Sequence, residues 1–341
     1  MSQVYQLDYR NALTPALEAE LDNFLAAIPG FHYFQSPAFF RVCLTSKKLT
    51  PFYLIAYEGA AVAGLLLGFK QVQIRLPVAS FLSSRTIVWG GPVVRPTSPA
   101  VVEALLQFYD KCRSASIYTQ VRNLVDTALY RDLFSHYGFQ YEAHLTILVA
   151  LTKSEAALWQ AMSTKRRNQI RRAEKEGCVV VQDNSLTALQ ASYAILQEVY
   201  QRAKLPLPDF GHFDSLRQQS DNRSGLRLFT VYHEGLIIGC MVCIAYGNWL
   251  FDYYAGAYSQ HYKKYPNDLL PWAVFLWAKQ KGFTHFDFGG AGKPDVPYGV
   301  RDYKKQFGGE LVCFGRYERV HHPMAFSVAT SVFARLQQLR R

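Results

Sequence analysis

Two stretches of matching pattern decide the fold: PFYLIAYEGAAVAGLLLGF at Pro51–Phe69 and LRLFTVYHEGLIIGCMVCIAY at Leu226–Tyr246. Each is typical of a β-hairpin, with two apolar strands that meet at Glu58-Gly59 or at Glu234-Gly235. The sequence after each hairpin predicts a strand, a helix, a strand, a short helix and a final strand, in the same order. Two similar hairpins alone would be common by chance, so the agreement of the later elements favours a duplicated unit.

The repeat is too long for a solenoid, so it predicts two similar domains. A chain of 341 residues is also about two domains long, at the usual ~150 residues each. The element order is that of the GNAT-type N-acetyltransferase fold. We therefore expect an α/β (α+β) protein of two tandem GNAT-like domains, each a mixed, mainly antiparallel sheet flanked by helices. The expected domains are 1–151 and 152–322, and a helix over 323–341 packs back on the first.

The hydrophobic pattern also predicts where the elements lie. In the first half we expect a helix that opens at Thr14-Pro15, strands at 52–57, 61–71 and 86–94, a helix at 99–113, a strand at 116–122, a short helix at 126–136 and a long strand at 139–151. In the second half we expect a charged helix at 155–175, a strand at 178–182, helices at 186–203 and 212–219, strands at 226–232, 236–246 and 249–258, a helix at 267–281, a strand at 284–288, a turn or short helix near Asp302 and a strand at 310–317.

Composition excludes a disordered chain and points to an anionic partner. Half of the residues are hydrophobic and only 18% are charged, which is enough apolar material for a sizeable core. The 37 Lys and Arg residues exceed the 26 Asp and Glu residues, so the formal net charge is +11. This excess suits nucleic acid, a phosphorylated metabolite or an anionic membrane face. A merely basic soluble protein is the alternative.

The cysteines and the termini predict a cytoplasmic protein without metal. Cys240 and Cys243 form a C-x-x-C inside an apolar run, and no second pair completes a zinc site. We expect all six cysteines to be buried thiols in a reducing compartment. The start MSQVYQLDYR lacks the apolar region of a signal peptide, and the longest apolar runs are about half the ~20 residues that a membrane span needs. A position at the inner face of the membrane stays open.

The most basic segment is KRRNQIRRAEKEG at Lys165–Gly177. At helical spacing, Arg167, Arg171 and Lys175 share one face, while Arg166 and Ile170 share another. Guanidinium groups at this density suit phosphate, because each can donate to two oxygens. A solvated helix face with internal pairs such as Arg172–Glu176 explains the same residues. The candidate phosphate-binding residues are Lys165, Arg166, Arg167, Arg171 and Arg172.

Two further motifs lie near the end of the second half. Phe286–Gly292, FDFGGAG, follows a strand and is either a ligand loop or a tight strand exit that needs positive φ. Tyr303–Glu310, YKKQFGGE, carries two lysines beside aromatic residues. One of these lysines could place an ammonium group near a developing oxyanion, although a surface turn is the simpler interpretation of this motif taken alone.

Together these segments resemble the FemABX family of non-ribosomal peptidyltransferases. Lys165–Gly177 is similar to that family's K-x-R-x-x-I-R-K-A-E-x-x-G, and Phe286–Gly290 to its aromatic-Asp-aromatic-Gly-Gly. Tyr303–Gly309 is similar to its F-K-x-x-F-G-G, with tyrosine in place of phenylalanine. Gln35-Ser36-Pro37 and Gly90–Val94 in the first half also match. The order and spacing of the motifs carry the resemblance, which covers most of the chain, and there is no room for the helical arm of some members.

The resemblance implies transfer of an amino acid from aminoacyl-tRNA to an amine of a peptidoglycan precursor, with no permanently bound cofactor. In that case Lys304 stabilises the tetrahedral oxyanion, and Asp287 is a base or an orienting residue, or only caps the glycine loop. The basic helix then holds phosphates of tRNA or of a nucleotide-sugar carrier. The other candidate substrate-binding residues are Tyr253, Tyr254, Tyr303, Gly289 and Gly290, with core packing as the alternative for the first two.

Two departures from the family keep other functions open. Pro206–Leu216, PLPDFGHFDSL, has Asp209 four residues before Phe213, where many members have an arginine. Ser259–Leu269, SQHYKKYPNDL, lacks the glycines of a CoA-binding GNAT loop, and Asn267 is expected to cap a helix. The alternatives are an acyl-CoA-dependent N-acyltransferase acting on an amino sugar, polyamine or lipid precursor, and a catalytically silent module that binds RNA or nucleotide.

The C-terminal segment predicts an amphipathic helix with a basic end. Its apolar stripe and its arginines suit either a membrane surface or, as we favour, packing against the first domain. The stripe consists of Phe326, Val328, Ala329, Val332, Phe333 and Leu336, and the arginines are Arg335, Arg340 and Arg341.

Overall fold

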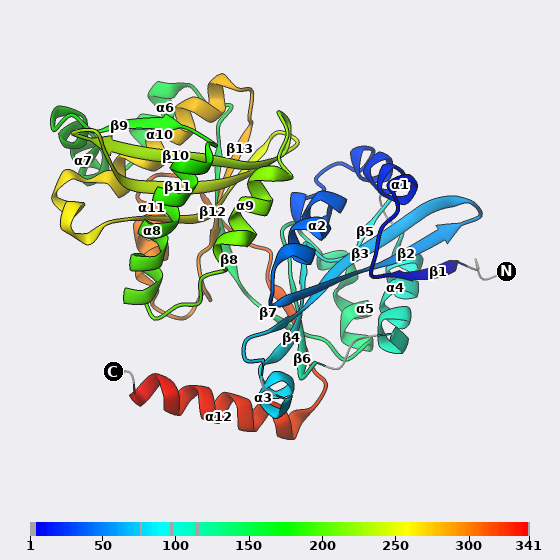
Figure 1. Cartoon of the computed structure of the whole chain (residues 1–341). Coiled ribbons are helices and arrows are strands. Elements are labelled where there is room, and N and C mark those ends of the chain that lie inside the picture. The colour runs from blue at the N-terminus through cyan, green and yellow to red at the C-terminus, as the bar shows by residue number, and fades with distance from the viewer. Residues whose placement is uncertain (1–4, 76, 96–97, 113–115, 340–341) are drawn as a thin grey trace. The chain divides into compact units, whose positions relative to one another are not determined.

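The protein folds into two compact units, each built around one β-sheet (Figure 1). The computed structural model describes residues 5–75, 77–95, 98–112 and 116–339. Unit 1 consists of Met1–Ala143 together with Phe314–Arg341, and unit 2 consists of His144–Cys313. The chain therefore enters unit 2 once and returns to complete unit 1.

The sheet of unit 1 has the strand order β1-β2-β3-β4-β6-β15-β7, and β5 also pairs with β3. All neighbours are antiparallel except β4 and β6, which run parallel. The strands are β1 (Gln6–Arg10), β2 (Leu49–Glu58), β3 (Ala61–Val72), β4 (Ser84–Trp89), β5 (Val93–Val94), β6 (Tyr118–Arg122), β7 (Gln140–Glu142) and β15 (Arg316–Val320). The helices are α1 (Pro15–Ala26), η1 (Tyr33–Gln35), α2 (Pro37–Thr45), α3 (Pro77–Leu82), α4 (Pro99–Cys112), η2 (Ala128–Tyr130), α5 (Arg131–His136) and α12 (Pro323–Leu339).

The sheet of unit 2 has the order β14-β8-β13-β12-β11-β10-β9, and only β12 and β13 run parallel among its described pairs. Its strands are β8 (Leu145–Ala150), β9 (Val179–Gln182), β10 (Gly225–His233), β11 (Leu236–Tyr246), β12 (Trp249–Ala257), β13 (His285–Gly290) and β14 (Glu310–Cys313). Its helices are α6 (Glu155–Ala161), α7 (Thr164–Lys175), α8 (Leu186–Arg202), α9 (Phe210–Gln218), η3 (Ser259–Lys264), α10 (Pro266–Gln280) and α11 (Gly299–Lys305).

The two sheets match strand for strand, which confirms the predicted pair of GNAT-like domains. Read from β1 and from β9, both sheets begin with three antiparallel strands and place the parallel pair in the same position. In both sheets the next strand, β15 or β8, is antiparallel to its neighbours on each side. The hairpins β2–β3 and β10–β11 turn at the two Glu-Gly pairs, as the sequence predicts.

Two predicted strands are each divided between the sheets. The expected strand 139–151 is β7 in unit 1 followed by β8 in unit 2, and the expected strand 310–317 is β14 in unit 2 followed by β15 in unit 1. At the second break Gly315 has φ +70°, and a Cβ there would lie 2.3 Å from the Tyr141 ring. The units therefore divide at 143/144 and 313/314, whereas we expected 151/152 and 322/323.

One predicted helix is also wrong. The expected helix 155–175 is broken at Met162-Ser163, where Ser163 has an extended backbone and its side chain accepts a hydrogen bond from the Arg166 N–H. Ser163 thus caps a new helix, α7, and the break separates its basic residues from α6. The sequence analysis also missed β1, α2 and α3.

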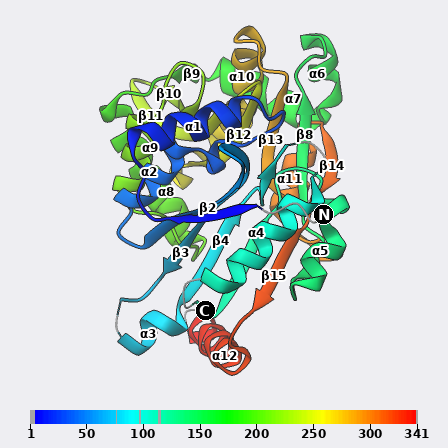
Figure 2. The ribbon, with the colours of Figure 1, turned by 90° about the vertical axis from the view of Figure 1, so that its right-hand side faces the viewer.

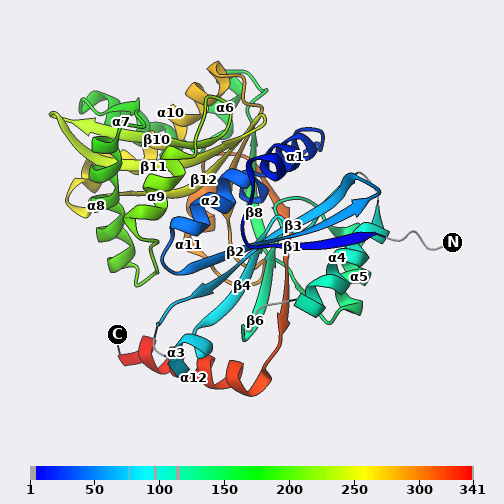
Figure 3. The ribbon, with the colours of Figure 1, turned by 45° about the vertical axis from the view of Figure 1, so that its right-hand side comes forward.

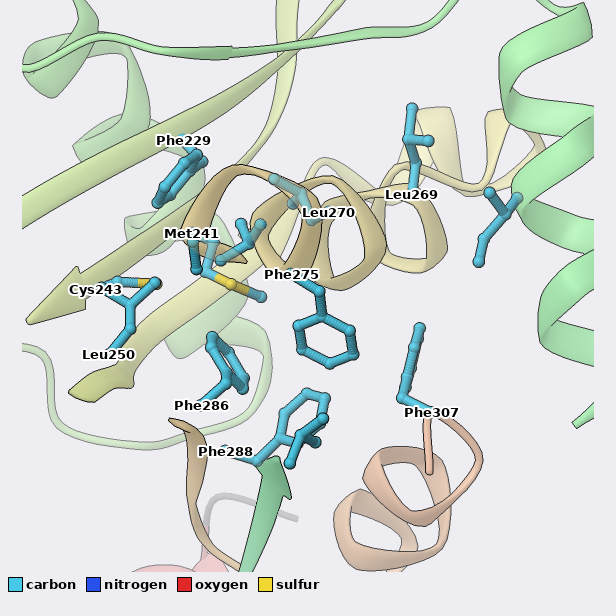
Figure 4. Close-up of a cluster of buried hydrophobic side chains, with 14 of the residues drawn as sticks. Phe229, Met241, Cys243, Leu250, Leu269, Leu270, Phe275, Phe286, Phe288 and Phe307 are labelled. Carbon is cyan, nitrogen blue, oxygen red and sulfur yellow. The ribbon is translucent and has the colours of Figure 1, made fainter. Parts of the chain in front are cut away.

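The core of unit 2 lies between its sheet and the helices α6, α7 and α10. Figure 4 shows Phe275 of α10 beside Phe286 and Phe288 of β13, with Phe307 pointing into the same cluster from just after α11. The ring centroids of Phe288 and Phe307 are 5.8 Å apart. Helices α8 and α9 pack against each other and against β10, β11 and β12, and Figure 1 shows them in front of the sheet, with α10 behind it. The cluster ties α11 to the end of β13.

The C-terminal helix α12 contacts α3 within unit 1, and Figures 2 and 3 show the two helices side by side. Phe326 packs edge-on against Tyr118, but Val328 and Val332, which we expected on the inner face, are each 51% exposed. Arg340, Arg341 and the side chains of Phe333 and Leu336 lie outside the described residues. None of the described helices has the length and apolar character to cross a membrane.

All six cysteines are free, as expected, but they are not all buried: Cys112 is partly exposed and Cys313 is exposed. Each lies near the end of its element, which sequence pattern alone does not distinguish from the core. Among the described residues, no group of three or more His, Cys, Asp or Glu side chains is arranged to hold a metal ion.

Candidate active site

The parallel strands β12 and β13 pair only from Trp249 opposite His285 to Phe251 opposite Asp287, and then they part. Each strand carries a bulge just beyond. On β12, Val242 and Cys243 of β11 face Tyr254 and Asp252, which leaves Tyr253 as the extra residue. On β13, the pairing with β8 shifts between Asp287 and Gly290. Bulges redirect side chains, and the carboxyl ends of parallel strands are the usual place for a ligand in an α/β sheet.

Lys304 reaches this place from α11. Its Nζ donates a hydrogen bond to the carbonyl oxygen of Phe288 and lies 3.8 Å from Oδ2 of Asp252. Its side chain is 14% exposed. An ammonium group has three N–H donors. Within the described part of the chain, these two oxygens are its only polar partners, and the contact with Asp252 is too long for a hydrogen bond, so at least one donor remains for a ligand oxygen.

Asp252 was missed by the sequence analysis. It lies in the strand segment FDYYAGA, whose aromatic residues drew attention while the carboxylate was passed over. Burial raises the pKa of Asp252, and the nearby Lys304 ammonium acts in the opposite direction. A buried carboxylate beside a buried ammonium is costly unless the two groups are paired. The pairing therefore offsets the cost of placing both groups inside the site.

Asp287 is 2% exposed and holds the glycine turn after β13. Its Oδ1 accepts hydrogen bonds from the Thr146 hydroxyl and from the Gly289 N–H, the latter at 2.7 Å. Gly289 has φ +65°, and a Cβ there would lie 3.1 Å from the Asp252 carbonyl oxygen. Gly290 is exposed. These contacts favour the orienting role for Asp287 over the role of base. Thr146 is a second residue that the sequence analysis missed.

The buried Asp287 predicts a pH dependence of stability. Burial raises its pKa to about 6, although the hydrogen bonds from Thr146 and Gly289 and the charge of Lys304 oppose the shift. The folded state therefore binds this proton more tightly than the unfolded state, so its contribution is most favourable below about pH 4 and is lost as the pH rises towards 6. Asp287→Asn retains an acceptor oxygen and removes the charge.

We expect the difference in unfolding free energy between Asp287→Asn and the unchanged protein to grow by about 2 kcal/mol from pH 4 to pH 7, in favour of the variant. Urea titrations at each pH measure it. Parallel pH profiles for the two proteins would show that the carboxyl group is not shifted.

Tyr253 and Tyr254 form part of an aromatic wall beside Asp252. The Tyr253 hydroxyl lies 3.0 Å from Nε2 of His212, and the Tyr254 ring packs against Tyr200 and Phe213, with centroids 5.3 and 5.1 Å away. Burial lowers the pKa of His212 to about 4, so this imidazole is neutral at physiological pH. The sequence prediction that these tyrosines line a ligand site and the core-packing alternative both remain compatible with their half-buried positions.

The five basic candidates of α7 do not act alike. Arg166 is 7% exposed and forms an ion pair with Asp268 of α10. Arg167 donates to the carbonyl oxygens of Met162 and Gln160 at the end of α6. Lys165, Arg171 and Arg172 are exposed, and the two arginines lie over the rings of Trp159 and Tyr265 at 5.3 and 5.1 Å. Only these three residues can meet a phosphate without rearrangement.

The start of α10 differs from the expected loop. The chain passes through η3 to Tyr265, which has φ +56° and precedes Pro266, so Asn267 lies inside the first turn rather than capping the helix. Pro266 has no N–H, and the Asp268 N–H is bonded to the Tyr265 carbonyl oxygen. The Asp268 carboxylate, in the first turn, is paired with Arg166. The Tyr303 hydroxyl donates a hydrogen bond to the carbonyl oxygen of Asn267 at 2.5 Å.

The segment Pro206–Leu216, which lacks the expected arginine, contains the capped start of a helix. Asp209 is the N-cap of α9, and its side chain accepts the His212 N–H at 3.1 Å. Asp209, at the position where many members of the family have an arginine, thus serves as the N-cap of α9.

Comparison with known proteins agrees with this architecture. Residues 161–305 match the family description "Acetyltransferase (GNAT) domain". FemX is similar in structure, with a TM-score of 0.71 at 14% identity, over 94% of this chain and 99% of that chain. A tandem GNAT protein from the clavulanic acid biosynthesis pathway has a TM-score of 0.55 at 9% identity, over 92% and 98%. The C-terminal domain of a putative lysylphosphatidylglycerol synthetase from Agrobacterium fabrum has a TM-score of 0.54 at 12% identity, over 79% and 85%. No curated protein matches the sequence.

The chain is therefore a tandem GNAT-fold protein with the fold of acyltransferases. More particularly, the fold is FemABX-like, since FemX resembles nearly the whole chain, as the ordered motifs predicted. At these low identities the likeness extends to the fold alone.

Proposed function

We propose that this protein is an aminoacyltransferase, which moves an amino acid from aminoacyl-tRNA to an amine of a peptidoglycan precursor on the cytoplasmic side of the membrane. The observation that carries the proposal is the position of Lys304: its ammonium lies at the parted carboxyl ends of β12 and β13, between the Phe288 carbonyl oxygen and Asp252, with a donor left over. The likeness in fold to FemX supports the choice of reaction.

The proposed step begins when the acceptor amine, once deprotonated, attacks the ester carbonyl carbon of the donor. A C–N bond forms, and the carbonyl oxygen becomes an oxyanion. This oxyanion accepts a hydrogen bond from a Lys304 N–H that is not used within the protein. The intermediate then collapses, the C–O bond to the terminal ribose of tRNA breaks, and the ribose oxygen takes up the proton that the amine has lost. Asp252 is the proposed acceptor of the amine proton, because its pKa is raised and its carboxylate lies beside Lys304.

The start of α10 supports a donor other than CoA. A CoA-binding GNAT domain holds pyrophosphate with backbone N–H groups at a helix start. Here Pro266 lacks an N–H, the Asp268 N–H is taken, and the Asp268 carboxylate places negative charge at the same end. Arg166 offsets that charge, but two N–H donors that a pyrophosphate would use are absent or already bonded.

The exposed basic residues of α7 fit a donor with many phosphates. If Lys165, Arg171 and Arg172 contact tRNA phosphates, changing all three to Gln should make the slope of log affinity against log salt shallower by roughly 2 to 3. Filter binding of aminoacyl-tRNA over a range of salt concentrations measures the slope. The matched control changes three other exposed lysines of unit 2, Lys281, Lys293 and Lys305, and removes the same charge. Equal slopes for both variants would remove α7 from the tRNA site.

An acyl-CoA-dependent N-acyltransferase acting on an amino sugar, polyamine or lipid precursor is the second candidate. It is favoured by the match to an acetyltransferase (GNAT) domain and by the structural likeness to a tandem GNAT protein. Both candidates use an amine acceptor and an acyl donor, and so they differ mainly in the donor.

A donor panel tests the proposal. The protein is mixed with a muramyl pentapeptide precursor and either aminoacyl-tRNA labelled in its amino acid or labelled acetyl-CoA, and the acceptor is analysed by mass spectrometry. We expect label to reach the peptide amine from aminoacyl-tRNA only. Saturable turnover of acetyl-CoA without any transfer from aminoacyl-tRNA would establish the second candidate instead.

A further inference from the structure

Arg166 differs from the other basic residues of α7 because it is directed into the interior of unit 2. Its side chain and that of Asp268 are each 9% exposed, and they form an ion pair. Its guanidinium carbon also lies 4.5 Å from the centre of the Tyr303 ring and 5.5 Å from that of Phe307. One side chain thus joins α7, the first turn of α10 and the segment that carries Lys304.

This junction holds α11 at the residue next to Lys304. Tyr303 is fixed on one side by the Arg166 stack and on the other by its hydrogen bond to the Asn267 carbonyl oxygen. Helix α11 has only seven residues, too few to be stable alone, so its place depends on such side-chain anchors. A shift of Tyr303 would move Lys304 away from the Phe288 carbonyl oxygen and Asp252.

The pair is a poor device for stability alone. A buried ion pair is often replaced by apolar residues of similar size with no loss of stability. Here the Nε of Arg166 is also buried with no hydrogen-bond partner among the described residues, which adds a desolvation cost. A buried charge pair kept at such a cost, with its guanidinium over the residue that precedes Lys304, is better explained by the geometry that it imposes.

We propose that Arg166 and Asp268 are positioning residues for Lys304, which set the direction of its ammonium by clamping Tyr303 between α7 and α10. This inference rests on the proposed function only in so far as Lys304 takes part in transfer. The clamp itself concerns the reactivity of one lysine, which can be measured without any substrate.

The test compares the full-length chain with the double variant Arg166→Met/Asp268→Leu, which fills the same space without charge. The control is Lys264→Gln/Glu176→Gln, which removes an exposed ion pair that joins the end of α7 to η3 at 2.6 Å. Each protein is labelled with acetic anhydride from pH 6 to 11, and the peptide containing Lys304 is quantified by mass spectrometry. Urea unfolding confirms that each variant is folded.

We expect the double variant to fold and to label faster at Lys304 across the pH range, while the control keeps the profile of the unchanged protein. A folded double variant with an unchanged Lys304 profile would overturn the proposal. If the double variant does not fold, Arg166→Lys is measured in its place, because it keeps the charge and loses the planar stack on Tyr303. An unchanged Lys304 profile in that folded variant would likewise overturn the proposal.

Transfer assays on the same proteins separate this inference from the proposed function. If both hold, kcat falls roughly 10- to 100-fold with little change in KM, since the reacting group is misplaced and not lost. A changed Lys304 profile without any aminoacyl transfer in the unchanged protein would leave the clamp standing and reject the proposed function.

Discussion

Lys304→Met is expected to lower the rate of transfer about 10²- to 10³-fold, the usual effect of removing one donor to an oxyanion. The substitution keeps most of the apolar stem and removes the ammonium, and so it leaves the acceptor amine and the donor ester without their fixed charge partner. Because the Lys304 ammonium donates its hydrogen bond mainly in the transition state, kcat should fall with little change in KM. Single-turnover assays with labelled aminoacyl-tRNA measure the rate.

The neighbouring Lys305→Met is the matched control, since Lys305 lies on the same short helix and is exposed. It should retain the rate within about threefold, because it contacts nothing at the parted strands. A Lys304→Met protein that is folded and transfers at the unchanged rate would remove Lys304 from the chemistry, whatever the fold.

Gly309→Ala is expected to destabilise the protein by about 3 kcal/mol or more, the largest effect on stability that we predict for a single methyl group. Gly309 has φ +95°, and an added Cβ would lie 2.8 Å from the Leu148 carbonyl oxygen and about as close to the side chains of Ile147 and Val149. Backbone and core strand β8 cannot move aside cheaply. Urea unfolding measures the loss.

Gly282→Ala measures the cost of the positive φ alone, without a steric clash. Gly282 has a similar φ of +83°, but a Cβ there would meet nothing within 4 Å. It should therefore cost only about 1 to 2 kcal/mol, the price of a left-handed alanine. Equal losses at the two glycines would mean that β8 does not pack against Gly309 as described.

The sequence was sufficient for the architecture because the duplicated hairpins have strong patterns. Alternating and continuous apolar runs around two Glu-Gly turns predicted both hairpins and a mixed, mainly antiparallel sheet in each half, but not which strands run parallel. The pattern could not show that β7 and β8, or β14 and β15, belong to different sheets. Each run is a continuous stretch with strand-forming residues in both halves, and only the identity of the neighbouring strands separates the halves.

The site was predicted less completely than the fold. Motif resemblance singled out Lys304, Asp287 and Gly289, which the structure brings together at the end of β13. It missed Asp252, because a lone carboxylate in an aromatic strand gives no spacing signal, and it placed Arg166 among the phosphate-binding residues. The break at Ser163 changes the direction of α7, and no capping-box partner follows that serine in the sequence to reveal it.

The most direct test of the central claim, that acyl transfer takes place at Lys304, is labelling with an electrophilic analogue of aminoacyl-adenosine, the end of the donor. The analogue carries an acylating group in place of the ester, and peptide mass spectrometry locates the adduct. The account predicts an adduct on Lys304 that excess aminoacyl-tRNA prevents and excess acetyl-CoA does not. An adduct elsewhere that acetyl-CoA prevents, with Lys304 unmodified, would contradict it.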